Sequence, residues 1–226
     1  MIRCITHFLL LTIAVCLLGG CATVHPPANP VDPVTVYVAD YGVHSAVMLP
    51  VGGNRFVEYA FGDWGYCAED RDGPFDSVGA LLVSQSSALG RRYIDLKPGD
   101  PYPMPKLEIP RTVFPVSVNR ADVEAVERKL AARYHRSLCT IVYNPGNDTD
   151  YVRDTEHYSV LHSCNGLTAS ELTAMGCKVN GWAIWSRFRL AGDAPAPPPS
   201  QASPTVVRAA LAPVAAPPAS VAVAGQ

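Results

Sequence analysis

A cysteine at the entrance of an expected helix is the residue of this 226-residue chain best placed to do chemistry. Cys164 follows Ser163, a favoured helix N-cap, and apolar residues at helical spacing continue to Gly176, a favoured C-cap. Free backbone N–H groups and the helix dipole stabilise a thiolate there, and also an oxyanion. We therefore predict Cys164 as a nucleophile with a lowered thiol pKa. The alternatives are a small buried side chain and half of a disulfide.

A thiolate nucleophile needs a base, and the base needs a third group to orient it. His44 starts one expected strand and Glu58 lies on the next, and facing side chains of neighbouring antiparallel strands are about 5 Å apart. The pattern predicts His44 as the general base and Glu58 as its orienting carboxylate. Asp63, in a Phe-Gly-Asp-Trp-Gly turn, is the alternative third member, and Tyr41 is an accessory candidate at the oxyanion.

Short β-rich segments and three expected helices must position these residues. Strands are expected at 34–39, 45–49, 55–61, 93–96 and 112–118, with a Gly52-Gly53-Asn54 turn before the third. Helical spacing predicts helices over 78–89, 122–134 and 164–175, and Gly90 is a stop signal for the first. Residues 144–154 indicate a polar loop. The expected fold class is α+β, a small antiparallel sheet with packed helices.

The N-terminal region has the pattern of an exported precursor. Arg3 precedes an apolar run from Phe8 to Leu18, which is too short to span a membrane and indicates a signal peptide over 1–20. Leu18-Gly19-Gly20-Cys21 resembles the lipobox of bacterial lipoproteins, which implies lipidation of Cys21. Acyl chains on that residue would hold the protein on a bilayer. An ordinary signal peptide with a chance cysteine is the alternative.

The regions flanking the expected domain contain many prolines. Residues 21–33 are predicted to be a lipidated, extended tether, and residues 193–226 a disordered Ala/Pro-rich tail. The domain itself is expected over 34–192. Ala22 follows the lipidated cysteine, and in enteric-type lipoproteins this residue implies the outer membrane.

Charge and cysteine content limit the function classes. A formal charge of −2 without a basic block makes nucleic acid an unexpected partner. Apart from Cys21 and two cysteines in the signal peptide, four remain: Cys67, Cys139, Cys164 and Cys177. Outside the cytoplasm they suggest two disulfides, or at most one if one thiol works, and the pairing stays open. Neither a metal site nor a cofactor is predicted.

Three segments carry a family resemblance. The order His44, Glu58, Cys164, with Ser45-Ala-Val-Met-Leu49 and Phe56-Val-Glu-Tyr-Ala60 around the first two, resembles the circularly permuted NlpC-like, papain-fold cysteine hydrolases, which include lecithin retinol acyltransferase-like proteins. The segments 36–45, 61–66 and 163–168 are also similar to an uncharacterised bacterial lipoprotein family with a domain of unknown function, of urease-region type. The resemblance covers about 34–190. This chain departs from it at Val43, where that family has Trp, and at Gly166 or Leu167, where it has a bulky aromatic residue.

The resemblance implies Cys164 as nucleophile, His44 as general base and Glu58 as orienting group of a thiol hydrolase or acyltransferase. The expected location is the periplasmic side of the cell envelope, and the expected substrate is an amide or ester in a peptidoglycan peptide or a lipid. The alternative from another class is a non-catalytic envelope lipoprotein that uses the scaffold for binding or structure.

Overall fold

The structure is a computed structural model, and it describes residues 21–69, 86–159 and 162–192. The fold is α+β. Its larger sheet has seven antiparallel strands in the order β6-β2-β3-β4-β5-β8-β7. The strands are β2 (Pro33–Asp40), β3 (Ser45–Gly52), β4 (Arg55–Asp63), β5 (Ser87–Asp95), β6 (Thr112–Asn119), β7 (Val142–Asn144) and β8 (Thr149–Asp154). The sheet is thus larger than the small sheet expected from the sequence.

The predicted meander at the centre of the sheet is confirmed. Strands β2 and β3 pair with Val38 opposite Val47, and β3 and β4 pair with Leu49 opposite Val57. The turn between β3 and β4 uses Gly52, at φ +118°, in a backbone region that residues with a side chain rarely adopt. Alternate residues of each strand point to opposite faces, so the buried apolar residues of β2, β3 and β4 divide into two clusters, one on each face of the sheet.

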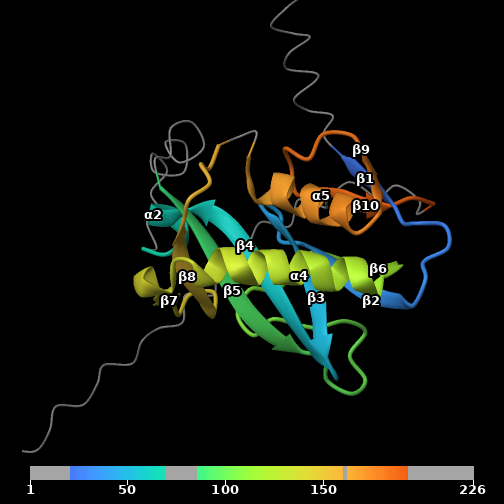
Figure 1. Cartoon of the computed structure of the whole chain (residues 1–226), viewed down its shortest axis with the longest axis horizontal. Helices are drawn as coiled ribbons and strands as arrows, with labels where there is room; N and C mark the ends of the chain where they lie inside the picture. Colours follow the sequence, from blue (N-terminus) through green and yellow to red (C-terminus); the bar gives the residue numbers. More distant parts are fainter. Residues whose placement is uncertain (1–20, 70–85, 160–161, 193–226) are drawn as a thin grey trace, which may run out of the picture. The chain divides into compact units, whose positions relative to one another are not determined.

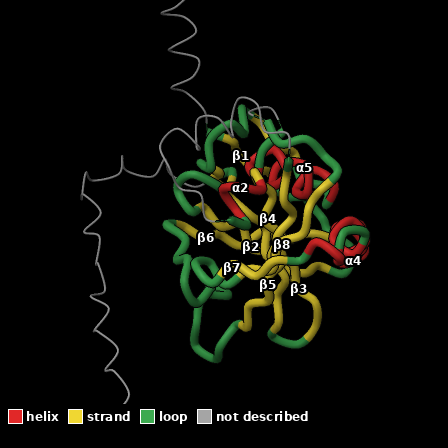
Figure 2. Tube along the Cα trace, turned by 90° about the vertical axis from the view of Figure 1, so that its left-hand side faces the viewer, coloured by secondary structure: helices red, strands yellow, loops and turns green. Residues whose placement is uncertain are grey.

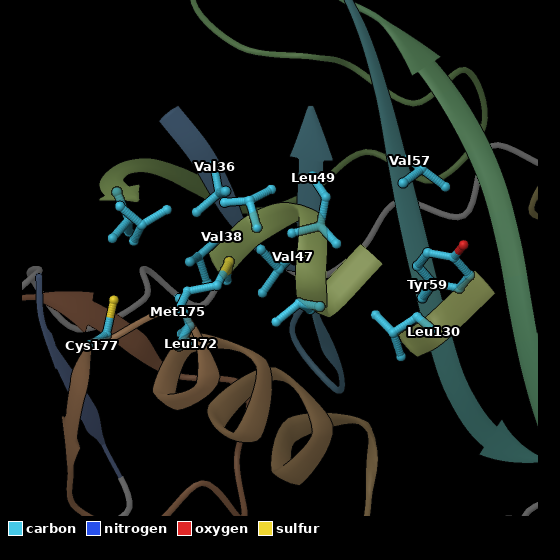
Figure 3. Packing of buried hydrophobic residues seen from close by; sticks show 14 of the residues in the cluster. Val36, Val38, Val47, Leu49, Val57, Tyr59, Leu130, Leu172, Met175 and Cys177 are labelled. Atoms are coloured by element: carbon cyan, nitrogen blue, oxygen red, sulfur yellow. The ribbon is translucent and has the colours of Figure 1, made fainter. Parts of the chain in front are cut away.

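Two helices cover one face of this sheet. They are α4 (Arg120–His135) and α5 (Cys164–Ala174), and Figures 1 and 2 show both on the same side of the strands. The expected apolar face of α4 is confirmed, because its four predicted core residues are all buried: Val123, Val126, Leu130 and Tyr134. Figure 3 shows Leu172 of α5 and Met175, the residue that caps its C-terminal end, beside Val38 and Val47 of the sheet.

The predicted tether over residues 21–33 is wrong at its start, where the chain already belongs to the folded domain. Residues Ala22–His25 form strand β1, which pairs with β9 (Lys178–Asn180) and β10 (Phe188–Leu190) in a second, three-stranded sheet. Ala22 and Val24 are fully buried and belong to the main apolar core. Residues 22–25 alternate between apolar and polar side chains, as a strand does, but four positions are too few to predict a strand. The prolines that follow them instead indicated an extended tether.

Two other segments differ from expectation. The end of the helix expected over 78–89 is strand, since β5 begins at Ser87 and continues through Gly90; residues 78–85 lie outside the described part of the chain. A side chain at position 90 would meet the ring of Tyr151, so glycine allows β8 to approach. The loop expected over 144–154 instead contains β7, a turn and β8.

The described residues contain a third, single-turn α-helix, α2 (Trp64–Cys67), and a 3₁₀ helix, η1 (Leu138–Thr140). None of the described helices is long and apolar enough to cross a membrane. The expected signal peptide over 1–20 and the expected tail over 193–226 lie outside the described residues.

Candidate active site

The helix that carries Cys164 begins and ends as the sequence predicts. Ser163 is the N-cap of α5, and its side chain accepts a hydrogen bond from the Gly166 N–H at 3.4 Å. After the helix, the N–H groups of Gly176 and Cys177 donate to carbonyls of the last turn, and Gly176 has φ +82°. This closure is a Schellman motif. Cys164 is therefore fixed as the first helical residue.

The surroundings of the Cys164 thiol differ from the sequence expectation. Cys164 is only 9% exposed, and this burial raises the pKa of its thiol to about 11. Hydrogen bonds from the backbone N–H groups of Ser45, Asn165 and Cys164, and from the Tyr158 hydroxyl, act in the opposite direction. The predicted lowering of this pKa is wrong, because removing a thiolate from water costs more than these donors return.

Helix α5 is attached to the sheet beside this thiol. The Ser45 hydroxyl, at the start of β3, donates to Asn165 Oδ1 at 2.8 Å and lies 3.1 Å from Thr168 Oγ1. All three side chains are buried. Because His44 precedes Ser45, this attachment also brings the backbone of His44 close to the first turn of α5.

The His44 ring is held by two neighbours. It stacks on Tyr41, with ring centres 4.6 Å apart, and its Nε2 lies 3.3 Å from Glu108 Oε1. Burial lowers the pKa of His44 to about 4; the Glu58 charge raises it and the Arg92 charge lowers it. The imidazole is therefore neutral at pH 7, with Nδ1 left to accept a proton. Within the described residues, no hydrogen bond joins this ring to Cys164.

Glu58 does not orient His44 as predicted. One carboxylate oxygen lies 2.6 Å from Arg92 Nη2, and the other accepts a hydrogen bond from the Tyr41 hydroxyl at 2.7 Å. Glu58 and Arg92 face each other across β4 and β5, and both are buried. One oxygen therefore neutralises the guanidinium and the other accepts from Tyr41, so Glu58 acts on His44 through its charge.

Glu108 is the carboxylate that contacts His44, and no sequence pattern predicted this contact. It lies between β5 and β6 and also binds Arg92 Nη1, at 3.2 Å. Burial raises the pKa of Glu108, while Arg92 lowers it. A carboxylate in a loop rich in proline shows neither strand alternation nor helical spacing, so no periodic pattern marks it.

The two accessory candidates have other tasks. The Tyr41 hydroxyl bridges Glu58 and Arg92, each at 2.7 Å, so it is not directed at an oxyanion beside Cys164. Asp63 caps α2 by accepting from the Tyr66 N–H at 2.9 Å. The charge of Asp63 raises the pKa values of Tyr158 and Cys67. The charges that shift the pKa of His44 are instead those of Glu58, Arg92 and Asp40.

Two residues near the thiol escaped prediction. Tyr158 donates toward Cys164, and its ring packs edge-on against Phe61, 5.6 Å between centres. Cys67 is close enough for its charge and that of Cys164 to interact, and burial raises its thiol pKa. All five cysteines in the described residues are free: Cys21, Cys67, Cys139, Cys164 and Cys177.

Comparison of the chain with protein-family models, with curated proteins and with solved structures finds no match in any of the three. The geometry around Cys164 and His44 is therefore the basis on which a function can be proposed.

Proposed function

We propose that this chain is a lipoprotein of the bacterial cell envelope, anchored through Cys21, and a thiol hydrolase or acyltransferase with Cys164 as its nucleophile. The proposed substrate is an amide or ester, in a peptidoglycan peptide or a lipid acyl group. The proposed architecture is the permuted NlpC-like, papain-like arrangement that the sequence resembles. The proposed substrate class rests on this resemblance alone.

One observation carries the proposal. Cys164 is the first residue of a capped helix, and the backbone N–H groups of Ser45, Asn165 and Cys164 itself, with the Tyr158 hydroxyl, all favour the thiolate. Such donors can also stabilise the negative oxygen that forms when sulfur attacks a carbonyl carbon. A merely structural cysteine in an apolar core does not need four donors.

The proposed reaction would start from two neutral groups rather than from a thiolate–imidazolium pair. At pH 7 the Cys164 thiol and the His44 imidazole are both neutral, because burial raises the first pKa to about 11 and lowers the second to about 4. During attack the thiol proton would pass to His44 Nδ1, with Glu108 holding Nε2. The protonated imidazole would then protonate the leaving amine or alcohol as the C–N bond of the amide or the acyl C–O bond of the ester breaks. Water or an alcohol would finally cleave the thioester.

The rival function is a non-catalytic envelope lipoprotein. It is favoured by the absence of a hydrogen bond between His44 and Cys164 in the described residues and by the high pKa of the thiol. Under this alternative the donors around the sulfur serve packing alone.

An acyl-enzyme trap separates the two functions. The full chain is incubated with activated esters of short and long fatty acids and of an N-acetylated peptide, and intact mass is followed over time. Catalysis predicts an acyl adduct on Cys164 that disappears as product forms, and its loss in Cys164→Ala. Cys139→Ala, which removes an exposed thiol, is the matched control. Equal turnover by wild type and Cys164→Ala overturns the enzyme proposal.

A further inference from the structure

Strand β1 leaves no length of chain between Cys21 and the folded domain. Ala22, the next residue, is fully buried and pairs with Phe188 of β10. Gly181 lies against the Cys21 carbonyl so closely that a side chain there would collide with it, and its φ of +104° also favours glycine. Cys21 is therefore held in a fixed position relative to the surface of the domain around it.

Two exposed tryptophans lie in the segment that follows this contact. Trp182 is 68% exposed and Trp185 is 49% exposed, whereas Trp64 is 5% exposed. Both are in the connection between β9 and β10, the strands that flank β1. Tryptophan prefers the boundary between water and lipid, where its ring is partly buried and its N–H stays hydrated.

The same segment is cationic in a chain of net negative charge. From residue 178 to residue 190 the sequence contains three cations and no carboxylate, although the whole chain has a formal charge of −2. All three are exposed: Lys178, Arg187 and Arg189. Cations beside exposed aromatic rings are typical of surfaces that bind anionic phospholipid headgroups.

We propose that the surface formed by Trp182, Trp185, Lys178, Arg187 and Arg189, here called the docking surface, binds the face of an anionic bilayer. Its aromatic rings would enter the headgroup region and its cations would contact lipid phosphates. The orientation of the domain on the membrane rests on the proposed anchor at Cys21, since that anchor emerges beside the surface. The affinity of the surface for anionic lipid does not depend on the anchor.

The docking surface is connected to the candidate active site. Asn165, which follows Cys164, donates through its side chain to the Ile184 carbonyl at 3.0 Å, between the two tryptophans. Figure 1 shows α5 lying along β1, β9 and β10. Docking would therefore hold the N-terminal end of α5 close to the headgroups.

Tryptophan emission tests the contact directly. The full chain is purified from bacterial membranes and reconstituted in nanodiscs of anionic phospholipid, with or without bromine on the acyl chains. Trp64→Phe keeps only the two surface rings, and Trp182→Phe with Trp185→Phe keeps only the buried one. We expect brominated lipid to reduce the emission of the first variant about two-fold and to leave the second unchanged, because only interfacial rings approach the quencher.

Intact mass of the same samples distinguishes failure of the docking surface from failure of the anchor. A lipid on Cys21 without quenching overturns the docking surface and leaves the anchor standing. Absence of a lipid overturns the anchor, and the docking surface is then tested by co-sedimentation with anionic and zwitterionic vesicles.

The co-sedimentation assay uses matched charge variants. Replacing Lys178, Arg187 and Arg189 together with glutamine should weaken binding to anionic vesicles about five-fold for each cation removed. The control replaces three exposed cations elsewhere: Arg55, Lys106 and Arg128. Equal losses in the two triple variants, or equal binding to zwitterionic vesicles, would overturn the proposal.

Discussion

The two faces of the seven-stranded sheet are built from the same strands but stabilised differently. On the face covered by α4 and α5, Val57 and Tyr59 of β4 lie in the apolar core. On the opposite face, Glu58 of the same strand forms a buried ion pair with Arg92. His44 stacks on Tyr41, a member of the apolar cluster on that opposite face, whereas Cys164 is on a helix of the first.

This difference explains why strand order alone suggested Glu58, and not Glu108, as the carboxylate that contacts His44. Successive residues of a strand point to opposite faces, so a carboxylate between two core residues cannot face the helix that covers them. Glu58 was placed correctly on β4, but its face makes Arg92 its partner. The candidate nucleophile and base approach each other only around the end of the sheet, where Ser45 begins β3.

The largest expected effect comes from breaking the buried ion pair. Arg92→Met should lower the free energy of unfolding by about 3–5 kcal/mol, because the Glu58 carboxylate would stay buried without its cation. Urea unfolding of the full chain, followed by circular dichroism, measures this loss.

Two further variants test the cause of that loss. Arg92→Met combined with Glu58→Met should recover most of the stability, since an apolar pair leaves no buried charge. Arg120→Gln, which opens an exposed ion pair with Asp32, should give no measurable change. If the double variant were as unstable as Arg92→Met, shape rather than charge would dominate this face.

On the helix-covered face, a cavity should be the damaging change. Leu172→Ala removes a fully buried side chain of α5 and should cost about 2–5 kcal/mol in the same unfolding assay. Leu138→Ala, at a side chain 42% exposed, is the control and should cost much less. A small loss for Leu172→Ala would mean that α5 packs loosely on the sheet.

The pH dependence of alkylation probes the thiol between the two faces. With its pKa raised to about 11, Cys164 has a smaller thiolate fraction at neutral pH than a free cysteine. Iodoacetamide should therefore label it about 100-fold more slowly than a free thiol at pH 7. The rate should still rise between pH 9 and about pH 11, because deprotonation is incomplete until the pH passes the thiol pKa.

Peptide mapping by mass spectrometry separates this site from the other cysteines, and exposed Cys139 serves as the reference for reagent quality. A labelling rate that is fast at pH 7 and independent of pH above it would contradict the raised pKa. Such a profile would instead indicate a thiolate stabilised by protonated His44.

Periodic signals predicted the central strands and the helices α4 and α5, whereas contacts between distant segments determine the elements and residues that were missed. The spacing of Val123, Val126, Leu130 and Tyr134 predicted the buried face of α4, and Ser163 predicted the start of α5. Glu108 and Tyr158 lie in connections without periodicity, and no local pattern marks their contacts. Strand β1 was missed because a four-residue strand is recognised by its partners, β9 and β10, which lie about 155 residues later.

The smallest expected effect concerns the cap that positions Cys164. Ser163→Ala removes the acceptor for the Gly166 N–H and should cost about 0.5–1 kcal/mol of unfolding free energy, since the capping bond is long at 3.4 Å. Ser163→Thr keeps an acceptor and should restore most of this loss. Ser170→Ala, at an exposed position within α5, controls for removal of a serine hydroxyl and should be neutral or slightly stabilising. Equal losses for Ser163→Ala and Ser170→Ala would show that the cap does not hold the first turn in which Cys164 lies.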